Sequence, residues 1–375
     1  MQERLINRSD ELLPLEEEWN RLCLGQKRPN PMLSWDWIYT WWKIYGADDP
    51  SMTLAVWVCR EGSRLRAAVP LYRRETPRGF LFRLIGTGED EAEAVCADHL
   101  GLLLDPDAEE ALVPAIADAL AALLRHAGDT LLLSDLGAGE PAIQGLIVEL
   151  RKVGLRTHLS AGPVCPYLNL CSTFDDQMNS FSVHFRAHVR QSFRFWQKQP
   201  DPAVEWHDQS GTLDSFWENL VSLHQARWTN SGKPGVFASP RFSAFHREIL
   251  SRFHRRGWLL AGSLKSGGKT LATNYGFRMG HTLSNYQTGM EIHVSKKMRP
   301  GILLHMEVIR RGIAEGMKEY DFMRGDDAYK RSFTGTTRAL VDLEAAQPGL
   351  SRALEWWKES LKDRLRPMYH KLLRR

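Results

Sequence analysis

The second half of the chain contains a strand-like run, a basic loop and a helix start in immediate succession, and this order restricts the folds available. The strand-like run covers residues 282–288, and the helix is expected to begin at Pro300. Its first amides have no acceptor within the helix, and the helix dipole favours negative charge at that end. Gly301 lets an anion approach the backbone closely. The pattern predicts a phosphate-binding helix start, with an ordinary helix start as the alternative.

The size and composition of the chain indicate a globular protein of two domains. Its 375 residues exceed the usual length of one compact domain. Hydrophobic residues make up 43% and charged residues 25%, which are values typical of soluble proteins and argue against long disorder. The net charge of +4 is too diffuse to indicate a nucleic-acid partner by itself.

The cysteines and histidines give no sign of a disulfide framework or a metal site. Five cysteines are scattered without a CxxC pattern, and the histidines show no spacing suited to zinc. We therefore expect no metal and a reducing compartment. The first fifteen residues lack the apolar core of a signal peptide, and no uncharged run is long enough to span a membrane. A cytoplasmic location is expected.

Hydrophobic periodicity predicts a mixed α/β fold of the α+β class, with mostly antiparallel sheets flanked by helices. Helices are expected at residues 12–24, 33–42, 107–126, 143–153, 216–228, 242–255 and 300–316. Strands are expected at residues 54–59, 65–72, 99–104, 131–136, 157–159, 258–264, 270–279 and 282–288. Residues 161–180 are rich in turn signals and are predicted to join the two halves. The tryptophans of the second helix favour core packing, with a cleft lining as the alternative.

Two basic segments suggest contacts with anionic partners. Arg186, Arg190, Arg194 and Lys198 recur every four residues, which places four cations along one helical face. Such a stripe is not expected to be buried, and either a solvated face or an anionic partner explains it. The last helix, residues 354–375, has a net charge of +5 from residue 356 onward, seven cations minus two carboxylates. It is expected to contact an anionic membrane surface or to pack back on the domain.

Several short motifs together resemble one family. They are Trp35-Asp36-Trp37 with Trp41-Trp42, the basic helix at residues 185–198, the segment from His224 to Trp228, Tyr286 with Gly289, the segment from Pro300 to Leu304, and the segment from Arg324 to Lys330. In this order they resemble the GNAT acyltransferase superfamily, in particular its CelD/BioF-like branch, which is related to the FemAB peptidyltransferases.

The resemblance implies two tandem GNAT-like domains, at residues 1–170 and 171–350, followed by a basic C-terminal helix at residues 351–375. It also implies acyl-CoA as co-substrate and a link to exopolysaccharide or cellulose production. The chain departs from the usual acetyl-CoA loop, which has an Arg/Gln-x-x-Gly-x-Gly/Ala pattern. Here the loop reads Lys297-Met298-Arg299-Pro300-Gly301.

Acyl transfer to an amine requires a neutral amine, a nearby thioester or ester, and donors facing the carbonyl oxygen. The predicted catalytic residues are Asp326 first, then Asp327, His224 and Tyr329. The predicted cofactor-binding residues are Lys297, Arg299, Gly301 and Ile302, and the predicted substrate-binding residues are Arg227, Trp228, Tyr286, Arg324 and Lys330. The alternatives are a structural network of both carboxylates with Arg324 and Lys330, and a structural hydrogen bond at His224.

Three functions agree with these features. The first is an N-acyltransferase that moves an acyl group from acyl-CoA or a similar thioester to an amine of a sugar nucleotide or amino-acid-like acceptor. The second is an aminoacyl-tRNA-dependent transferase of FemAB type, which the basic stripe favours. The third is a non-catalytic partner of a polysaccharide synthase, with peripheral membrane contact through the C-terminal helix.

Overall fold

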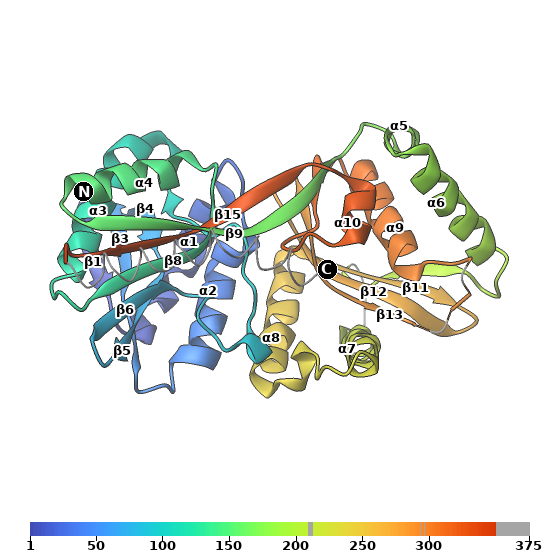
Figure 1. Ribbon diagram of the computed structural model, residues 1–375, viewed down its shortest axis with the longest axis horizontal. Coiled ribbons are helices and arrows are strands. Elements are labelled where there is room, and N and C mark those ends of the chain that lie inside the picture. The colour runs from blue at the N-terminus through green and yellow to red at the C-terminus, as the bar shows by residue number, and fades with distance from the viewer. Residues whose placement is uncertain (209–212, 293, 296, 350–375) are drawn as a thin grey trace, which may run out of the picture.

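A computed structural model describes residues 1–208, 213–292, 294–295 and 297–349. One large sheet runs through both halves of the molecule (Figure 1). From edge to edge its strands are β10 (Ala203–Trp206), β11 (Leu259–Ser266), β12 (Lys269–Met279), β13 (Thr282–Met290), β14 (Glu319–Asp321), β9 (Arg156–Asn169), β15 (Thr337–Ala346), β8 (Thr130–Gly137), β6 (Gly79–Leu84), β5 (Leu71–Thr76) and β2 (Met52–Leu54). A smaller sheet contains β1 (Gln2–Ile6), β3 (Val56–Glu61), β4 (Arg64–Val69) and β7 (Leu103–Leu104).

Helices cover both faces of these sheets. The first half contributes α1 (Glu16–Leu24), α2 (Trp35–Trp41), α3 (Glu109–Leu123) and α4 (Pro141–Lys152). The second half contributes α5 (Phe174–Ser180), α6 (Val183–Trp196), α7 (Leu213–Asn230), α8 (Pro240–Arg256), α9 (Pro300–Ala314) and α10 (Ala328–Phe333). In the second half α7 and α8 lie on one face of the sheet and α9 lies on the other (Figure 1).

The two halves exchange strands at the centre of the large sheet. β9 comes from the first half of the chain, yet its last three residues pair with β14 of the second half. β15 comes from the second half of the chain and pairs with β8 of the first. Figure 1 shows β9 and β15 side by side between the two halves, and their pairing extends over most of both strands. The two halves are therefore joined by backbone hydrogen bonds.

The predicted joint at residues 161–180 begins as a strand, because β9 continues to residue 169 and passes from one half to the other. The glycine and proline signals there mark an irregular strand. A β-carbon on Gly162 would lie 3.0 Å from the carbonyl oxygen of Leu340, so the backbones approach closely at this point. The register of β9 and β15 also shifts between Ala339 and Val341, as a β-bulge requires.

Both halves repeat one strand pattern, which confirms the predicted mixed fold of two sheet-and-helix units. In the first half, β5 and β6 pair antiparallel, and β8 returns after α3 to pair parallel with β6. In the second half, β12 and β13 pair antiparallel, and β14 returns after α9 to pair parallel with β13. The division at residues 170 and 171 stays a prediction, and β15 places residues 337–346 beside the first half. The predicted helix at residues 351–375 lies outside the described residues.

Aromatic side chains fill the contact between the two halves. Trp37 of α2 is fully buried. Its ring meets the rings of Phe245, Phe253, Phe277 and Tyr286, with centroids 4.8 to 6.4 Å apart. The dense tryptophans of the predicted second helix are thus core residues, and α2 packs against α8 of the other half.

Replacing Trp37 with alanine should destabilise the protein strongly, because it leaves a cavity among rings from both halves. Large-to-small changes of buried aromatics cost about 3–5 kcal/mol. Equilibrium unfolding in denaturant measures this loss. Val183→Ala is the control, since Val183 is 74% exposed and should leave the midpoint unchanged. A change below about 1 kcal/mol for Trp37→Ala would contradict this packing role.

Candidate functional site

The parallel pairing of β13 and β14 stops early and opens a fork in the sheet. Three residue pairs join these strands, and the last is Ser284 with Asp321. Beyond this pair, the chain after β14 stays with β9, because the amides of Phe322 and Gly325 donate to carbonyls of β9. A bulge at Tyr286 bends β13 at the same point. Among the described strands, the later half of β13 pairs with β12 alone, so its other edge offers free backbone groups.

Helix α9 begins at the open end of this fork. As predicted, its first residue is Pro300, and no side chain caps it. The amides of Gly301 and Ile302 precede the first intrahelical bond, which runs from Leu303 to Arg299. A β-carbon on Gly301 would lie 2.9 Å from the terminal methyl of Met290, the flexible end of a side chain that packs against this helix start. Lys297 and Arg299 are exposed beside it.

One side of the fork is the later half of β13, and the other side is the segment after β14, residues 322–325. Lys330 binds this second segment. It lies on α10 with a side chain only 6% exposed. Its ammonium group donates to the backbone carbonyls of Met323 (3.1 Å) and Arg324 (2.6 Å). Burial lowers the pKa of Lys330, although nearby carboxylates, Asp327 first, raise it. A lysine has three N–H donors. One therefore remains after these two carbonyls.

The two predicted carboxylates lie at the surface beside this lysine. Asp326 forms an ion pair with Arg331 at 2.5 Å, and its side chain is 53% exposed. The carboxylate of Asp327 is 62% exposed and lies 3.8 Å from the Lys330 ammonium. Tyr329 stacks on the buried His305, with ring centroids 5.6 Å apart. The structure thus brings Asp327, Tyr329 and Lys330 together, whereas Asp326 pairs with a surface cation.

The predicted residues of α7 lie on the helix that covers the later half of β13. His224 is buried, and its Nε2 accepts a hydrogen bond of 2.9 Å from the indole of Trp228. Burial lowers the pKa of His224 to about 4, so the ring is neutral near pH 7. Because the indole already occupies its Nε2 lone pair, this contact matches the structural alternative for His224. Arg227 is exposed on the same helix.

The two remaining predicted residues, Tyr286 and Arg324, contact the first half of the chain. The Tyr286 hydroxyl donates to the carbonyl of Val95 and lies 2.9 Å from Nε2 of His246. Arg324 forms ion pairs with Asp98 (2.5 Å) and Asp135 (3.0 Å). Both predicted substrate-binding residues therefore fix the contact between the halves.

Asp98 and Asp135 were missed by the sequence analysis, because neither belongs to a spaced motif. Asp98 is almost fully buried, and its carboxylate also accepts the amide of Arg324. Asp135 lies in β8 with a φ of 59°, a left-handed conformation that aspartate seldom adopts. Burial raises the pKa of Asp135 to about 6, although Arg324 pulls it down.

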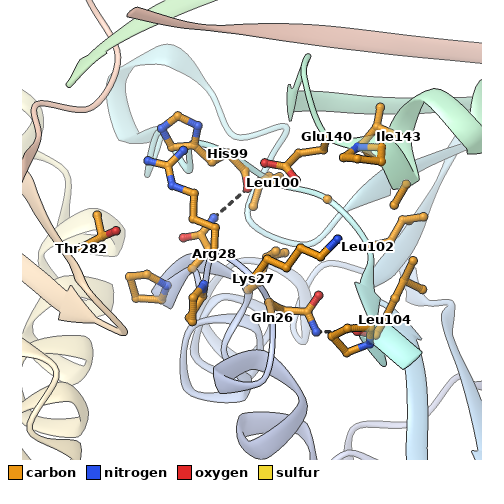
Figure 2. Close-up of a pocket in the computed structure, with 18 of the residues that line it drawn as sticks. Gln26, Lys27, Arg28, His99, Leu100, Leu102, Leu104, Glu140, Ile143 and Thr282 are labelled. Atoms are coloured by element: carbon orange, nitrogen blue, oxygen red, sulfur yellow. Dashed lines mark hydrogen bonds between the residues drawn. The ribbon is translucent and has the colours of Figure 1, made fainter. Parts of the chain in front are cut away.

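A pocket of about 110 Å³ lies between the two halves, next to the closed end of the fork (Figure 2). The last pair of the fork, Ser284 and Asp321, lies in its wall together with Met323. The opposite wall comes from the first half of the chain. It consists of the loop before α2, residues 99–104 and the start of α4, with Lys27, Arg28, His99 and Glu140 at the polar side (Figure 2).

His99 and Asp321 meet in this pocket. Nε2 of His99 lies 2.9 Å from the Asp321 carboxylate, which also accepts from Arg28 at 2.7 Å. The predicted strand at residues 99–104 is wrong at its start, since His99 has a φ of 55° and only Leu103–Leu104 forms a strand. A left-handed residue cannot continue an extended strand.

Residues 183–331 match the family of acetyltransferase (GNAT) domains. This range contains the fork, α9 and α10. This part of the second half is therefore similar to GNAT domains. No curated protein sequence matches the chain.

Solved structures show that the whole chain, including the part before the GNAT domain, has a known fold. FemX covers 92% of this chain and 97% of its own, with a TM-score of 0.63 and 11% identity. A conserved protein of unknown function from Bacteroides thetaiotaomicron covers 92% and 100%, with a TM-score of 0.58 and 14% identity. The C-terminal domain of a protein named as a lysylphosphatidylglycerol synthetase, from Agrobacterium fabrum, covers 94% and 97%, with a TM-score of 0.52 and 12% identity. The fold is therefore FemX-like.

None of the helices described here is long and apolar enough to cross a membrane. Among the residues described by the structure, no group of three or more histidine, cysteine, aspartate or glutamate side chains is arranged to hold a metal ion.

The Asp135 carboxyl should make stability depend on pH. Its pKa is about 6 in the folded protein against a reference of 3.8, a rise of about two units, so the folded state holds this proton more tightly. The stabilisation is present below the unfolded pKa and is lost as pH rises towards about 6. At about 1.36 kcal/mol per unit it amounts to about 3 kcal/mol.

Asp135→Asn cannot titrate. The free energy of unfolding of the natural protein, relative to this variant, should therefore fall by up to about 3 kcal/mol between about pH 4 and about pH 6. Denaturant unfolding across this range measures the difference. Parallel curves for the two proteins would contradict the raised pKa.

Proposed function

We propose that the protein transfers an acyl group from acyl-CoA, or a similar thioester, to the amine of a small acceptor. The observation that carries this proposal is the fork between β13 and β14, with α9 starting at its open end. The amides of Gly301 and Ile302 suit the diphosphate of the donor, and Lys297 and Arg299 add positive charge. The free edge of β13 suits the amides of an extended pantetheine arm, as an added strand would.

The two faces of β14 support a donor site on the side of α9 and an acceptor site on the side of the first half. Tyr320 and Phe322 pack with α9, whereas Asp321 and Met323, which alternate with them, line the pocket on the side of the first half. A donor whose phosphates lie at α9 and whose arm passes through the fork would present its acyl group on the pocket side. The third N–H of Lys330, which is bonded to the side of the fork formed by residues 322–325, is suited to stabilise negative charge on the acyl oxygen. In this arrangement Asp326 is not needed as the base.

Removing both loop cations should weaken donor binding. Lys297→Ala with Arg299→Ala deletes two exposed charges next to the helix start. Each exposed ion pair contributes up to about 1 kcal/mol, so the dissociation constant of acetyl-CoA should rise about tenfold. Titration calorimetry with acetyl-CoA and longer acyl-CoAs measures it.

The matched control is Arg190→Ala with Arg194→Ala, which removes the same charge from α6 and should leave acyl-CoA affinity unchanged. An equal loss in both double variants would show that only overall charge matters. No binding of any acyl-CoA to the natural protein would end the proposal for this donor.

A second candidate function uses aminoacyl-tRNA as donor, and the exposed face of α6 favours it. This helix contains no acidic residue. Arg190 and Arg194 on this helix, and Lys198 in the turn just after it, are exposed, and they make no ion pair with the described residues. A groove beside them, between α5, α6 and α9, also contains Phe174, Phe193 and Arg310. Guanidinium groups next to aromatic rings suit a phosphate backbone with unstacked bases.

If tRNA is the donor, its affinity should fall steeply with salt. Each neutralised phosphate contributes roughly 0.7 to 0.9 to the slope of log affinity against log salt. Replacing Arg190, Arg194 and Lys198 with alanine should therefore reduce this slope by about 2 to 3. Filter binding with bulk tRNA measures it, and absence of binding at low salt would exclude this donor.

The proposed link to exopolysaccharide or cellulose production rests on the resemblance alone. The basic segment that would dock a synthase or a membrane lies outside the described residues. Vesicle flotation with and without residues 354–375 tests that part of the proposal, and equal recovery of both forms would exclude a membrane role for this segment.

A further inference from the structure

We propose that the pocket between the halves holds the amine end of an amino-acid-like acceptor, and that His99, oriented by Asp321, takes the proton from that amine. This inference rests on the proposed acyl transfer, because it assigns the second substrate and the base of that reaction. It concerns residues of the first half of the chain, which the GNAT domain at residues 183–331 does not include.

The geometry of His99 is that of an oriented base. Its Nε2 lies 2.9 Å from the Asp321 carboxylate, an ion-pair contact whose angle falls outside hydrogen-bond geometry. The negative charge there favours the imidazole proton on Nε2, which leaves the lone pair on Nδ1. Asp321 is 1% exposed. Burial alone would raise the pKa of Asp321, but the close contact and charge of His99 and the charge of Arg28 outweigh it and keep the pKa below its usual value. The carboxylate therefore stays ionised as the partner of the ring.

The backbone holds His99 rigidly in this position. Its φ of 55° is left-handed and carries a conformational cost for a residue with a β-carbon. The Asn30 side chain donates to the carbonyls of Asp98 (2.9 Å) and His99 (2.8 Å). The next amide, of Leu100, donates to the carbonyl of Asp135. The strained residue is thus fixed by bonds on both sides, as expected for a side chain whose direction matters.

The position of this pair relative to the fork suits transfer. Asp321 belongs to the last residue pair before the strands separate. His99 therefore lies at the closed end of the fork, on the face of β14 that an acyl group would reach after passing between the strands. His224 and His305, by contrast, have ring nitrogens bonded to Trp228 and to Tyr320.

The size of the pocket limits what it encloses. An apolar cavity of about 150 Å³ accommodates benzene. A pocket of about 110 Å³ therefore encloses only a few non-hydrogen atoms, which corresponds to a small amine or the amine end of a larger molecule. Leu100, Leu102 and Ile143 provide an apolar wall (Figure 2).

The charges around His99 favour a zwitterion over a phosphate-bearing acceptor. In the pocket wall, Lys27 and Arg28 face three carboxylates, those of Glu109, Glu140 and Asp321. Behind this wall, Glu319 pairs with both Arg28 and Arg338, and Asp98 pairs with Arg324. The wall therefore has no excess of positive charge that would attract a sugar nucleotide. Figure 2 shows Lys27 and Glu140 on the pocket side, and neither makes an ion pair with the described residues.

The reaction balances with these groups. The acceptor ammonium gives one proton to Nδ1 of His99, and the neutral nitrogen attacks the thioester carbon. A C–N bond forms and the C–S bond breaks, and the second nitrogen proton passes to the leaving thiolate. The products are an amide, the free thiol and a protonated His99, which returns its proton to solvent.

Histidine-selective isotope labelling of the full chain tests both parts by NMR, with the His99 signal assigned through His99→Gln. In its neutral form, His99 should carry its proton on Nε2 rather than Nδ1, and Asp321→Asn should change this tautomer. Titration with L-alanine, L-leucine and ethanolamine should shift the His99 signal and leave exposed His126 unmoved. A neutral ring with its proton on Nδ1, or no shift with any amine, would overturn the inference.

Two further measurements separate this inference from the proposed donor. Acetyl-CoA binding without an amine-induced shift of His99 would overturn the pocket and keep the donor. A shift with ethanolamine but not with the amino acids would overturn the zwitterionic class. With an accepted amine and donor, His99→Gln should lower the turnover rate about a hundredfold and remove its decline at acid pH. His126→Gln should keep both the turnover rate and its decline at acid pH. If His99 has only a structural ion-pair role, His99→Gln would leave the pH dependence of turnover intact.

Discussion

The loss of pairing between β13 and β14 after Ser284 and Asp321 is the constraint on which the rest of the site depends. Backbone N–H and C=O groups in a sheet normally bond to the next strand, and groups left free inside a protein need another partner. Three features maintain the opening. Tyr286 forms a bulge in β13, the segment after Asp321 follows β9, and Lys330 binds two carbonyls of that segment. An extended ligand can provide the missing partner.

The first half of the chain does more than enlarge the core. Its Asp98 and Asp135 bind Arg324, its Val95 carbonyl binds the bulged Tyr286, and its His99 binds Asp321. Each of these contacts reaches a residue next to the fork. Together with the exchange of β9 and β15, they make the position of the fork depend on both halves. In the proposed reaction, the acceptor side of the site is built by the first half, which lies outside the matched residues 183–331.

The sequence predicts those features that local physics controls. Periodicity and turn residues gave the helix at Pro300 and the three strands before it, because amphipathic spacing and glycine turns act over a few residues. The basic stripe on α6 was correctly placed at the surface. The strands β9 and β15 were missed or shortened, since they pair across more than 150 positions of sequence and contain turn-like glycine and proline. The His99 and Asp321 pair was missed for the same reason, because 222 positions separate the two residues, 321 minus 99.

In the proposed reaction, the fork and the start of α9 bind one donor together. A crystal structure of the full chain with coenzyme A tests it most directly. The diphosphate should lie at the amides of Gly301 and Ile302, and the pantetheine arm should lie between β13 and residues 322–325, with its thiol towards the pocket. Coenzyme A bound elsewhere, or a fork filled by the protein's own side chains when coenzyme A is present, would contradict it.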